Sequence, residues 1–141
     1  MDLQDRLAAV LGEIMPLQRE DDGALTLHHD ATIASLRVVA IAEGLELVSL
    51  TQILAWDLPL DAKLRTQVAE HAHKTLLGTV SLAAKSGHKE IAAGAKRNSK
   101  KSADVLLRYN FPAAGLADEA LRTLIMMVLA TGADVRRALV S

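Results

Sequence analysis

The chain of 141 residues contains no cysteine and only three aromatic residues, Trp56, Tyr109 and Phe111. Without thiols the protein can form neither a disulfide nor a thiolate metal site. Hydrophobic residues make up 50% of the sequence, so its core must be built from Leu, Val, Ile, Met and Ala side chains. The length fits one domain spanning residues 1–141, which is long enough to enclose such a core.

The sequence also lacks an excess of one charge and a long hydrophobic run. Its net charge of −1 gives no overall attraction to nucleic acid or to membranes. The longest apolar run, Leu124–Ala130, is far shorter than the roughly 18 residues that a membrane-spanning helix needs. The charged start with Asp2, Asp5 and Arg6 does not resemble a secretory signal. We therefore expect a cytoplasmic protein without membrane insertion.

Motifs that carry chemistry are missing as well. The sequence contains no Gly-x-Ser-x-Gly elbow and no phosphate-binding loop. His71 and His73 would point about 200° apart on a helix, and His28 and His29 would point to opposite faces of a strand. Asp21–Gly23 lacks the later ligands and the closing Glu of a calcium loop. We therefore expect no enzymatic activity, no cofactor and no metal.

What the sequence does contain is a regular apolar pattern. Helical spacing predicts helices over Leu3–Ile14, Asp61–Leu77 and Asp118–Leu139. Alternating or branched apolar residues predict five strands, with a weak sixth over Lys89–Ala95. The five strands are Leu25–Leu27, Ile33–Ala42, Leu45–Leu54, Thr79–Ala84 and Ala103–Tyr109. The first three of these strands should form an antiparallel meander.

The grouping of these elements predicts the fold class. Their order is helix, three strands, helix, two or three strands, helix, which favours an α+β fold over a doubly wound sheet. We expect a twisted antiparallel sheet of five to six strands packed with three helices. Ile33–Ala42 is apolar on both faces, so we expect that strand to be covered on both sides.

A basic segment is the most prominent charge feature. Residues 85–108 carry seven Lys or Arg and two Asp or Glu, with Lys96, Arg97, Lys100 and Lys101 close together. These cations could contact phosphates, with Tyr109 and Phe111 offering rings for stacking. The segment could instead be a solvated hairpin tip that discourages edge pairing, or a docking surface for an acidic partner. A nucleic-acid-binding, regulatory or scaffold module is therefore the alternative function.

The last predicted helix is apolar around most of its circumference. Its main stripe faces the predicted sheet, while Met126, Met127 and Leu129 lie outside the centre of that stripe. Flexible methionine side chains can fill a core or adapt to a partner. The sequence leaves open whether Met126 and Met127 face the core or a partner.

Taken in order, the elements resemble class I type III secretion chaperones, the CesT/SycE-like family. The resemblance covers nearly the whole chain and is best in three places. The first is the Leu3–Ile14 helix followed by Asp-Asp-Gly and a short strand; the second is Leu76-Leu77-Gly78 followed by Thr79–Ala84; the third is Leu106–Pro112 followed by Gly115-Leu116 and Glu119–Leu121.

The resemblance implies a non-enzymatic homodimer in the bacterial cytoplasm that serves type III protein secretion and virulence. Such a chaperone binds the N-terminal segment of a secreted effector in extended form and keeps it soluble and export-competent. It also implies two surfaces on this chain. The floor of the effector-binding groove would be Ile14, Leu25, Leu27, Leu36 and Val38. The dimer contact would be Val68, Leu76, Val80 and Leu82.

Overall fold

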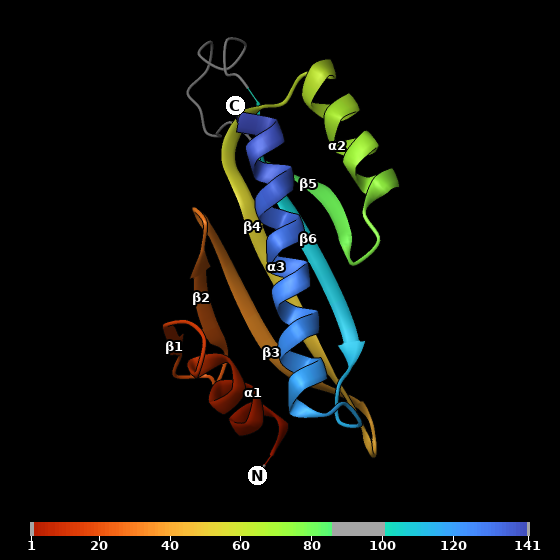
Figure 1. Cartoon of the computed structure of the whole chain (residues 1–141). Helices are drawn as coiled ribbons and strands as arrows, with labels where there is room; N and C mark the ends of the chain where they lie inside the picture. The colour runs from red at the N-terminus through yellow and green to blue at the C-terminus, as the bar shows by residue number, and fades with distance from the viewer. Residues whose placement is uncertain (1, 86–100, 141) are drawn as a thin grey trace, which may run out of the picture.

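A computed structural model describes residues 2–85 and 101–140 and shows three helices packed on one antiparallel sheet (Figure 1). The elements in chain order are α1 (Leu3–Gly12), β1 (Leu17–Arg19), β2 (Leu25–His29), β3 (Thr32–Ala42), β4 (Leu45–Pro59), α2 (Ala62–Lys74), β5 (Thr79–Lys85), β6 (Ser102–Pro112) and α3 (Asp118–Val140). The sheet has six strands in the order β1-β2-β3-β4-β6-β5. The predicted α+β class, with three helices and a six-stranded sheet, is confirmed.

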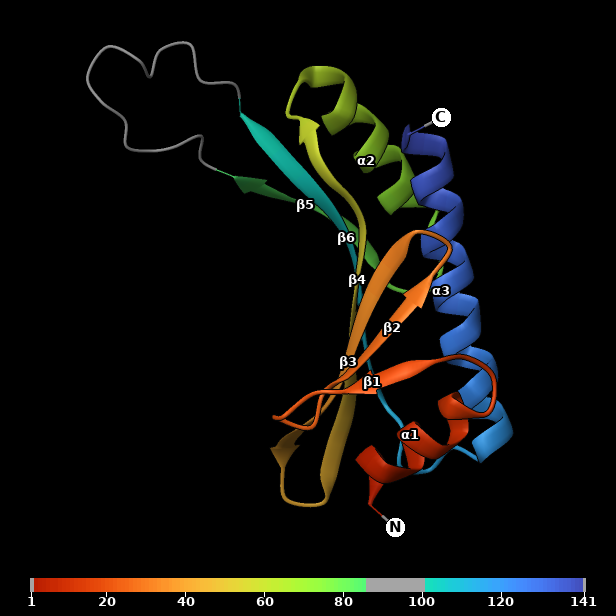
Figure 2. The same cartoon turned by 90° about the vertical axis from the view of Figure 1, so that its left-hand side faces the viewer.

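The strand order follows from two kinds of connection. Short turns join β2, β3 and β4 into the predicted antiparallel meander. The longer connection through α2 carries the chain past one position, so β6 lies between β4 and β5. All three helices lie on the same side of the sheet (Figure 2). The expectation that β3 is covered on both sides is therefore wrong for the part of the chain described, because the helices cover only one face.

The core lies between this sheet and the helices. It is aliphatic, as expected: among the largest fully buried side chains only Gln52 is polar, and the others are Leu or Ile. Helices α1 and α2 begin where Asp2 and Asp61 accept hydrogen bonds from the backbone N–H of Asp5 and Leu64, each at 2.8 Å. Local capping thus sets where the helices begin, and burial of their apolar stripes holds them on the sheet.

Some element boundaries differ from the prediction. Strand β1 was not expected, and β4 continues to Pro59 with register shifts on either side of Ala55. Helix α2 ends at Lys74 because Thr75 is extended, with ψ 122°. Gly78 has φ +87° and leads the chain into β5 instead of ending the helix. The weak strand predicted over Lys89–Ala95 lies outside the described residues.

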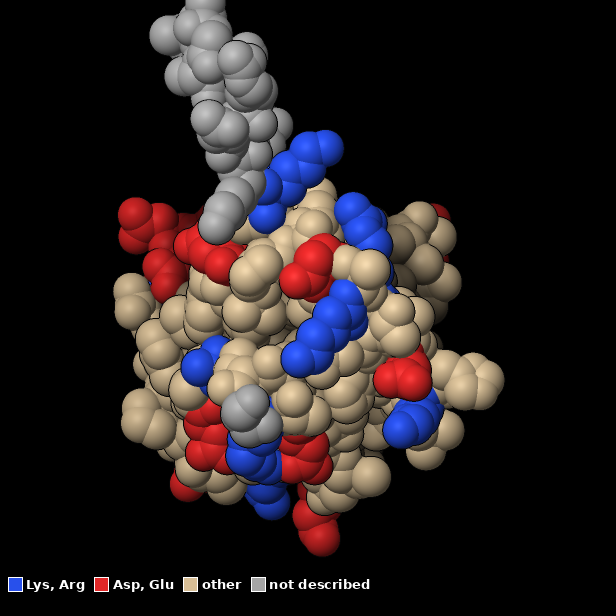
Figure 3. Space-filling view, turned by 90° about the horizontal axis from the view of Figure 1, so that it is seen from above, with Lys and Arg blue, Asp and Glu red and all other residues tan. Residues whose placement is uncertain are grey.

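Charges on the described surface are mixed in sign. Two ion pairs join the N-terminal segment to α3, Arg6 Nε of α1 to Asp118 Oδ1 at 2.6 Å, and Arg122 to Oε1 of Glu13, which follows α1, at 2.8 Å. Figure 3 looks onto the end of the molecule that carries the C terminus, where described cations and anions alternate without a continuous patch of either sign. Exposed pairs of this kind contribute about 0–1 kcal/mol each, so the core dominates stability.

A two-residue turn joins β2 and β3 in a strained conformation. His29 pairs with Thr32, and the two residues between them have positive φ, 44° at Asp30 and 66° at Ala31. Turns of this type favour glycine at the second position, because a Cβ atom disfavours positive φ.

We expect Ala31→Gly to raise the free energy of unfolding by about 1 kcal/mol, since it relieves this strain. Urea denaturation of the purified variant measures the change. The matched control is Ala9→Gly on the exposed face of α1, which should lower stability by about 1 kcal/mol. A loss of stability in both variants would contradict the strained turn.

Candidate protein-binding site

One edge of the sheet is only partly covered. Strand β5 begins to pair with β6 at Thr79, opposite Arg108, whereas β6 continues for four residues to Pro112. Residues Tyr109–Pro112 pair with β4 on one side, and no described strand lies on their other side. We call this stretch the open edge. Unpaired backbone groups at such an edge can bind another extended chain.

The direction of the backbone groups at the open edge follows from Gly78. A Cβ atom on Gly78 would lie 3.0 Å from the carbonyl oxygen of Arg108, so this carbonyl points toward β5. Backbone groups two residues apart in a strand point the same way. The N–H and C=O of Asn110 therefore face outward at the open edge, together with the C=O of Pro112.

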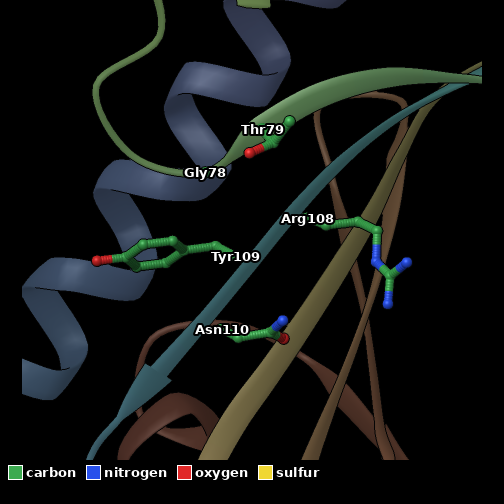
Figure 4. A pocket seen from close by; sticks show the side chains of 5 residues that line it. All are labelled: Gly78, Thr79, Arg108, Tyr109 and Asn110. Atoms are coloured by element: carbon green, nitrogen blue, oxygen red, sulfur yellow. The ribbon is translucent and has the colours of Figure 1, made fainter.

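A depression of about 510 Å³ lies beside the open edge. It is lined by Gly78, Thr79, Arg108, Tyr109 and Asn110. Figure 4 shows the Tyr109 ring on the side of α3 and the Arg108 and Asn110 side chains on the opposite side of the sheet. An added strand would thus meet an aromatic ring on one face and a cation and an amide on the other.

Leu76 is an exposed apolar residue two positions before Gly78, which lines this depression. It lies in the connection just before Gly78, and 89% of its surface is exposed, the most of any large hydrophobic residue described. The Tyr109 ring stacks on Phe111 with ring centroids 5.2 Å apart. Exposure of a leucine at this level loses about 2 kcal/mol of possible burial energy, so a partner that covers it gains stability.

A second surface is the face of the sheet that carries no helix, which we call the helix-free face. It consists of the side chains that alternate with the buried ones on the three central strands. They are Ile33, Ser35, Arg37 and Val39 of β3, Leu47, Ser49, Thr51 and Ile53 of β4, and Asp104, Leu106, Arg108 and Asn110 of β6. This face mixes apolar rows with small polar and charged residues.

The predicted groove floor is mostly core. Leu25, Leu27 and Leu36 have no exposed surface, Val38 is partly buried, and only Ile14 is exposed, at 42%. The prediction that these residues form an accessible groove is therefore wrong for the three leucines. They lie on the face of β2 and β3 that the helices cover, and alternation of side chains leaves the opposite face open.

The predicted dimer contact is also divided by burial. Val68 and Val80 lie in the core, and Leu82 packs partly against it. Of the four residues, only Leu76 projects into solvent. Buried side chains cannot form a dimer surface in this conformation, so this assignment is corrected for Val68 and Val80.

The remaining candidate residues divide between surface and core. Met126 packs against the core, whereas Met127 is 51% exposed on the outer face of α3. Phe111 is buried and cannot stack on a nucleic-acid base. Lys101 is exposed just before β6, while Lys96, Arg97 and Lys100 lie outside the described residues.

A cluster of Lys85, Asp57 and Asp104 is held together by ion pairs and a hydrogen bond among its own members. Lys85 Nζ lies 2.7 Å from Asp57 Oδ1 and 3.1 Å from Asp104 Oδ1, and the backbone N–H of Asp57 donates to Asp104 Oδ1 at 3.0 Å. Hydrogen bonds to Asp57 and then Asp104 raise the pKa of Lys85. Within residues 2–85 and 101–140, no group of three or more His, Asp or Glu is placed to hold a metal ion.

No helix in the described part of the chain is long and apolar enough to cross a membrane.

The open edge was missed by sequence reasoning because it depends on where β5 stops relative to β6. Only Leu76-Leu77 before a glycine hinted at an exposed apolar connection. Helical periodicity would place Leu76 on the buried stripe of α2, but the helix ends before it.

Comparisons with known proteins support the fold alone. No protein-family model matches the chain, and no curated protein matches it. Among solved structures it is similar to the crystal structure of YbjN, a candidate transcription regulator from E. coli. The two share 13% sequence identity with a TM-score of 0.65, over 95% of this chain and 88% of YbjN. At an identity this low, the similarity shows that the chain shares the fold of YbjN and shows nothing about its function.

Proposed function

We propose that this protein is a non-enzymatic chaperone that binds an extended segment of a partner protein by strand addition at the open edge. The observation that supports this most is the free edge of Tyr109–Pro112, and the exposed residue Leu76 lies in the connection that leads into the neighbouring strand β5. Strand addition joins a peptide to a sheet through backbone hydrogen bonds, while alternate side chains select the sequence.

The energetics predict a reversible contact. Asn110 and Pro112 offer up to three backbone hydrogen bonds, each contributing about 1 kcal/mol net, and burial of Leu76 adds about 2 kcal/mol. Ordering four residues of the partner costs about 1–2 kcal/mol each. The two sides nearly balance, so the partner must bring further apolar contacts. A weak edge contact of this kind holds a chain unfolded and still releases it.

In its specific form, the proposal is a class I type III secretion chaperone. The partner is then the N-terminal segment of a secreted effector, and the chaperone is a homodimer in the bacterial cytoplasm. The order of elements and the three motifs that resemble this family support it. An effector held in extended form stays unfolded, which export through a narrow channel requires.

The direct test is co-purification of the chain with the products of the genes that adjoin its own. The proposal expects a complex with one secreted protein, and truncation should confine binding to the N-terminal part of that protein. If the chain binds none of these products, or binds only a folded domain, the chaperone function is wrong.

The open edge itself is tested by Asn110→Pro, which removes the outward N–H group. Proline is tolerated at a sheet edge, so pairing with β4 should survive. We expect this variant and Leu76→Ser each to weaken the complex about tenfold, equivalent to about 1.4 kcal/mol, by titration calorimetry. Met127→Ser is the matched control on α3 and should bind normally. Unchanged affinity in both edge variants would place the partner elsewhere.

A regulatory or nucleic-acid-binding module is the second candidate, favoured by the description of YbjN as a candidate transcription regulator. The basic segment Lys96–Lys101 would then contact phosphates, and Lys101 is exposed. Such binding must weaken steeply with salt. A band-shift assay should show DNA binding that is lost in the double variant Lys100→Glu, Lys101→Glu; no binding at low salt removes this candidate.

A further inference from the structure

An apolar row crosses the helix-free face. Ile33 of β3 pairs with Ile53 of β4, and Ile53 pairs with Leu106 of β6, which in turn lies opposite Ser81 of β5. The three large side chains are partly exposed, and no described helix or strand covers this face of the sheet. The next row on β3 and β4 holds the small residues Ser35 and Thr51, which allow a flat surface to approach closely.

Opposite charges flank this row at equal distances on β6. Asp104 lies two residues before Leu106 and Arg108 two residues after it, each about 7 Å along the strand. Asp104 belongs to the cluster with Asp57 and Lys85, which carries one net negative charge. Arg108 is exposed and takes part in none of the ion pairs found among the described residues.

This arrangement is complementary to itself. A twofold axis along the apolar row would stack two sheets face to face with their strands antiparallel. Each apolar side chain then meets its own copy, and Arg108 of each protomer faces the negative cluster at Asp104 of the other. Stacked sheets lie about 10 Å apart, which a long arginine side chain spans.

We infer that the helix-free face is the surface through which two copies of this chain form a dimer, with Leu106 close to the twofold axis. The inference rests on the homodimer within the proposed function, but it does not depend on the bound segment. It moves the dimer contact from α2 and β5, where Val68 and Val80 are buried, to the three central strands.

The occupant is a second copy because the charge pattern specifies one. A surface with charges of one sign would fit a partner of the other sign, whereas a row flanked symmetrically by both signs fits its own image. The open edge of β6 lies in the plane of the sheet, so an added strand and a stacked second sheet can be present together.

Light scattering and sedimentation of the wild-type chain and three variants test the interface. The wild-type mass should be close to twice the 15.1 kDa monomer at micromolar concentration. Leu106→Asp should weaken the dimer about 100-fold, because it buries two carboxylates against each other. Arg108→Asp should weaken it about tenfold and Arg108→Lys much less. Met127→Asp on α3 is the control and should remain dimeric.

Cross-linking gives a second readout that does not disturb the fold. The chain has no cysteine, so Leu106→Cys introduces a single thiol near the proposed axis. A short bis-maleimide should join two Leu106→Cys chains efficiently and two Met127→Cys chains poorly. A monomeric wild type, a dimer that survives Leu106→Asp in folded form, or preferential linking through Met127→Cys would each overturn the inference.

Co-purification separates this inference from the proposed function. A dimer that behaves as expected but binds no adjoining gene product keeps the inference and removes the chaperone function. A monomeric chain that still binds an effector through the open edge does the reverse.

Discussion

Replacing Gly132 with alanine is expected to lower the free energy of unfolding by about 3 kcal/mol, although alanine is the better helix former. Gly132 is buried in the middle of α3, where the helix crosses β4. A Cβ atom at this position would overlap the side-chain amide of Gln52 and lie 2.7 Å from its Nε2 atom. The glycine therefore lets helix and sheet approach closely.

Gln52 cannot move aside at low cost. Its Nε2 donates hydrogen bonds to Thr32 Oγ1 at 2.9 Å and to the backbone oxygen of Leu129 at 3.1 Å. Its Oε1 is buried and has no hydrogen-bond partner among the described residues. Displacing the amide would leave a buried donor unpaired as well, which costs about 1–3 kcal/mol.

A double-mutant cycle with Gln52→Ala isolates this contact. In the Gln52→Ala background the added methyl group has room, so Gly132→Ala should be neutral or stabilise by up to about 1 kcal/mol. Urea denaturation of the four proteins gives the coupling energy. Gly12→Ala is the control, because Gly12 ends α1 with no atom within 4 Å of the added Cβ. An equal loss in both backgrounds would show that Gln52 is not the cause.

Gly78→Ala is expected to have the second largest effect, a loss of about 2–3 kcal/mol. Gly78 has φ +87°, a conformation that costs an alanine about 1–2 kcal/mol. The added Cβ would also lie 2.8 Å from Leu107 Cδ2 and 3.0 Å from the Arg108 oxygen. To avoid these contacts, the start of β5 would have to move away from β6, at the position where the open edge begins.

Gly44→Ala separates the two causes. Gly44 has a similar φ of +76° in the turn between β3 and β4, but nothing lies within 4 Å of an added Cβ. The Gly44→Ala variant should lose only about 1 kcal/mol of unfolding free energy, because it suffers the backbone strain of a positive φ but no steric contact. The difference between the two variants in thermal or urea denaturation measures the contact with β6. Equal losses would mean that the contact costs nothing.

The local elements were predictable from residue patterns. The spacing of Leu3, Leu7 and Leu11 predicts α1, and Asp2 and Asp61 mark the starts of two helices, because caps and periodicity act between residues close in sequence. Strand β1 could not be predicted from the sequence, because three residues are too few to show an alternating pattern.

The candidate binding surfaces were not predictable in this way. Both faces of β3 are apolar, and periodicity could not tell which one the helices would cover. The family resemblance implies a groove floor that includes Leu25, Leu27 and Leu36, but the helices cover the sheet face on which these three residues lie. Helical periodicity extends the predicted helix to Leu77, because no glycine or proline follows Lys74 to mark the observed end of α2.

The sequence by itself determined the α+β class, the aliphatic core, and the absence of cysteine chemistry, because these depend on composition and short-range order. Only the tertiary structure decided which sheet face stays free, that β6 outruns β5 to leave an open edge, and that Gly132 must make room for Gln52. Each of these depends on the register and contact of segments far apart in the chain. Register and contacts of this kind arise from tertiary packing, and short-range sequence patterns carry no information about them.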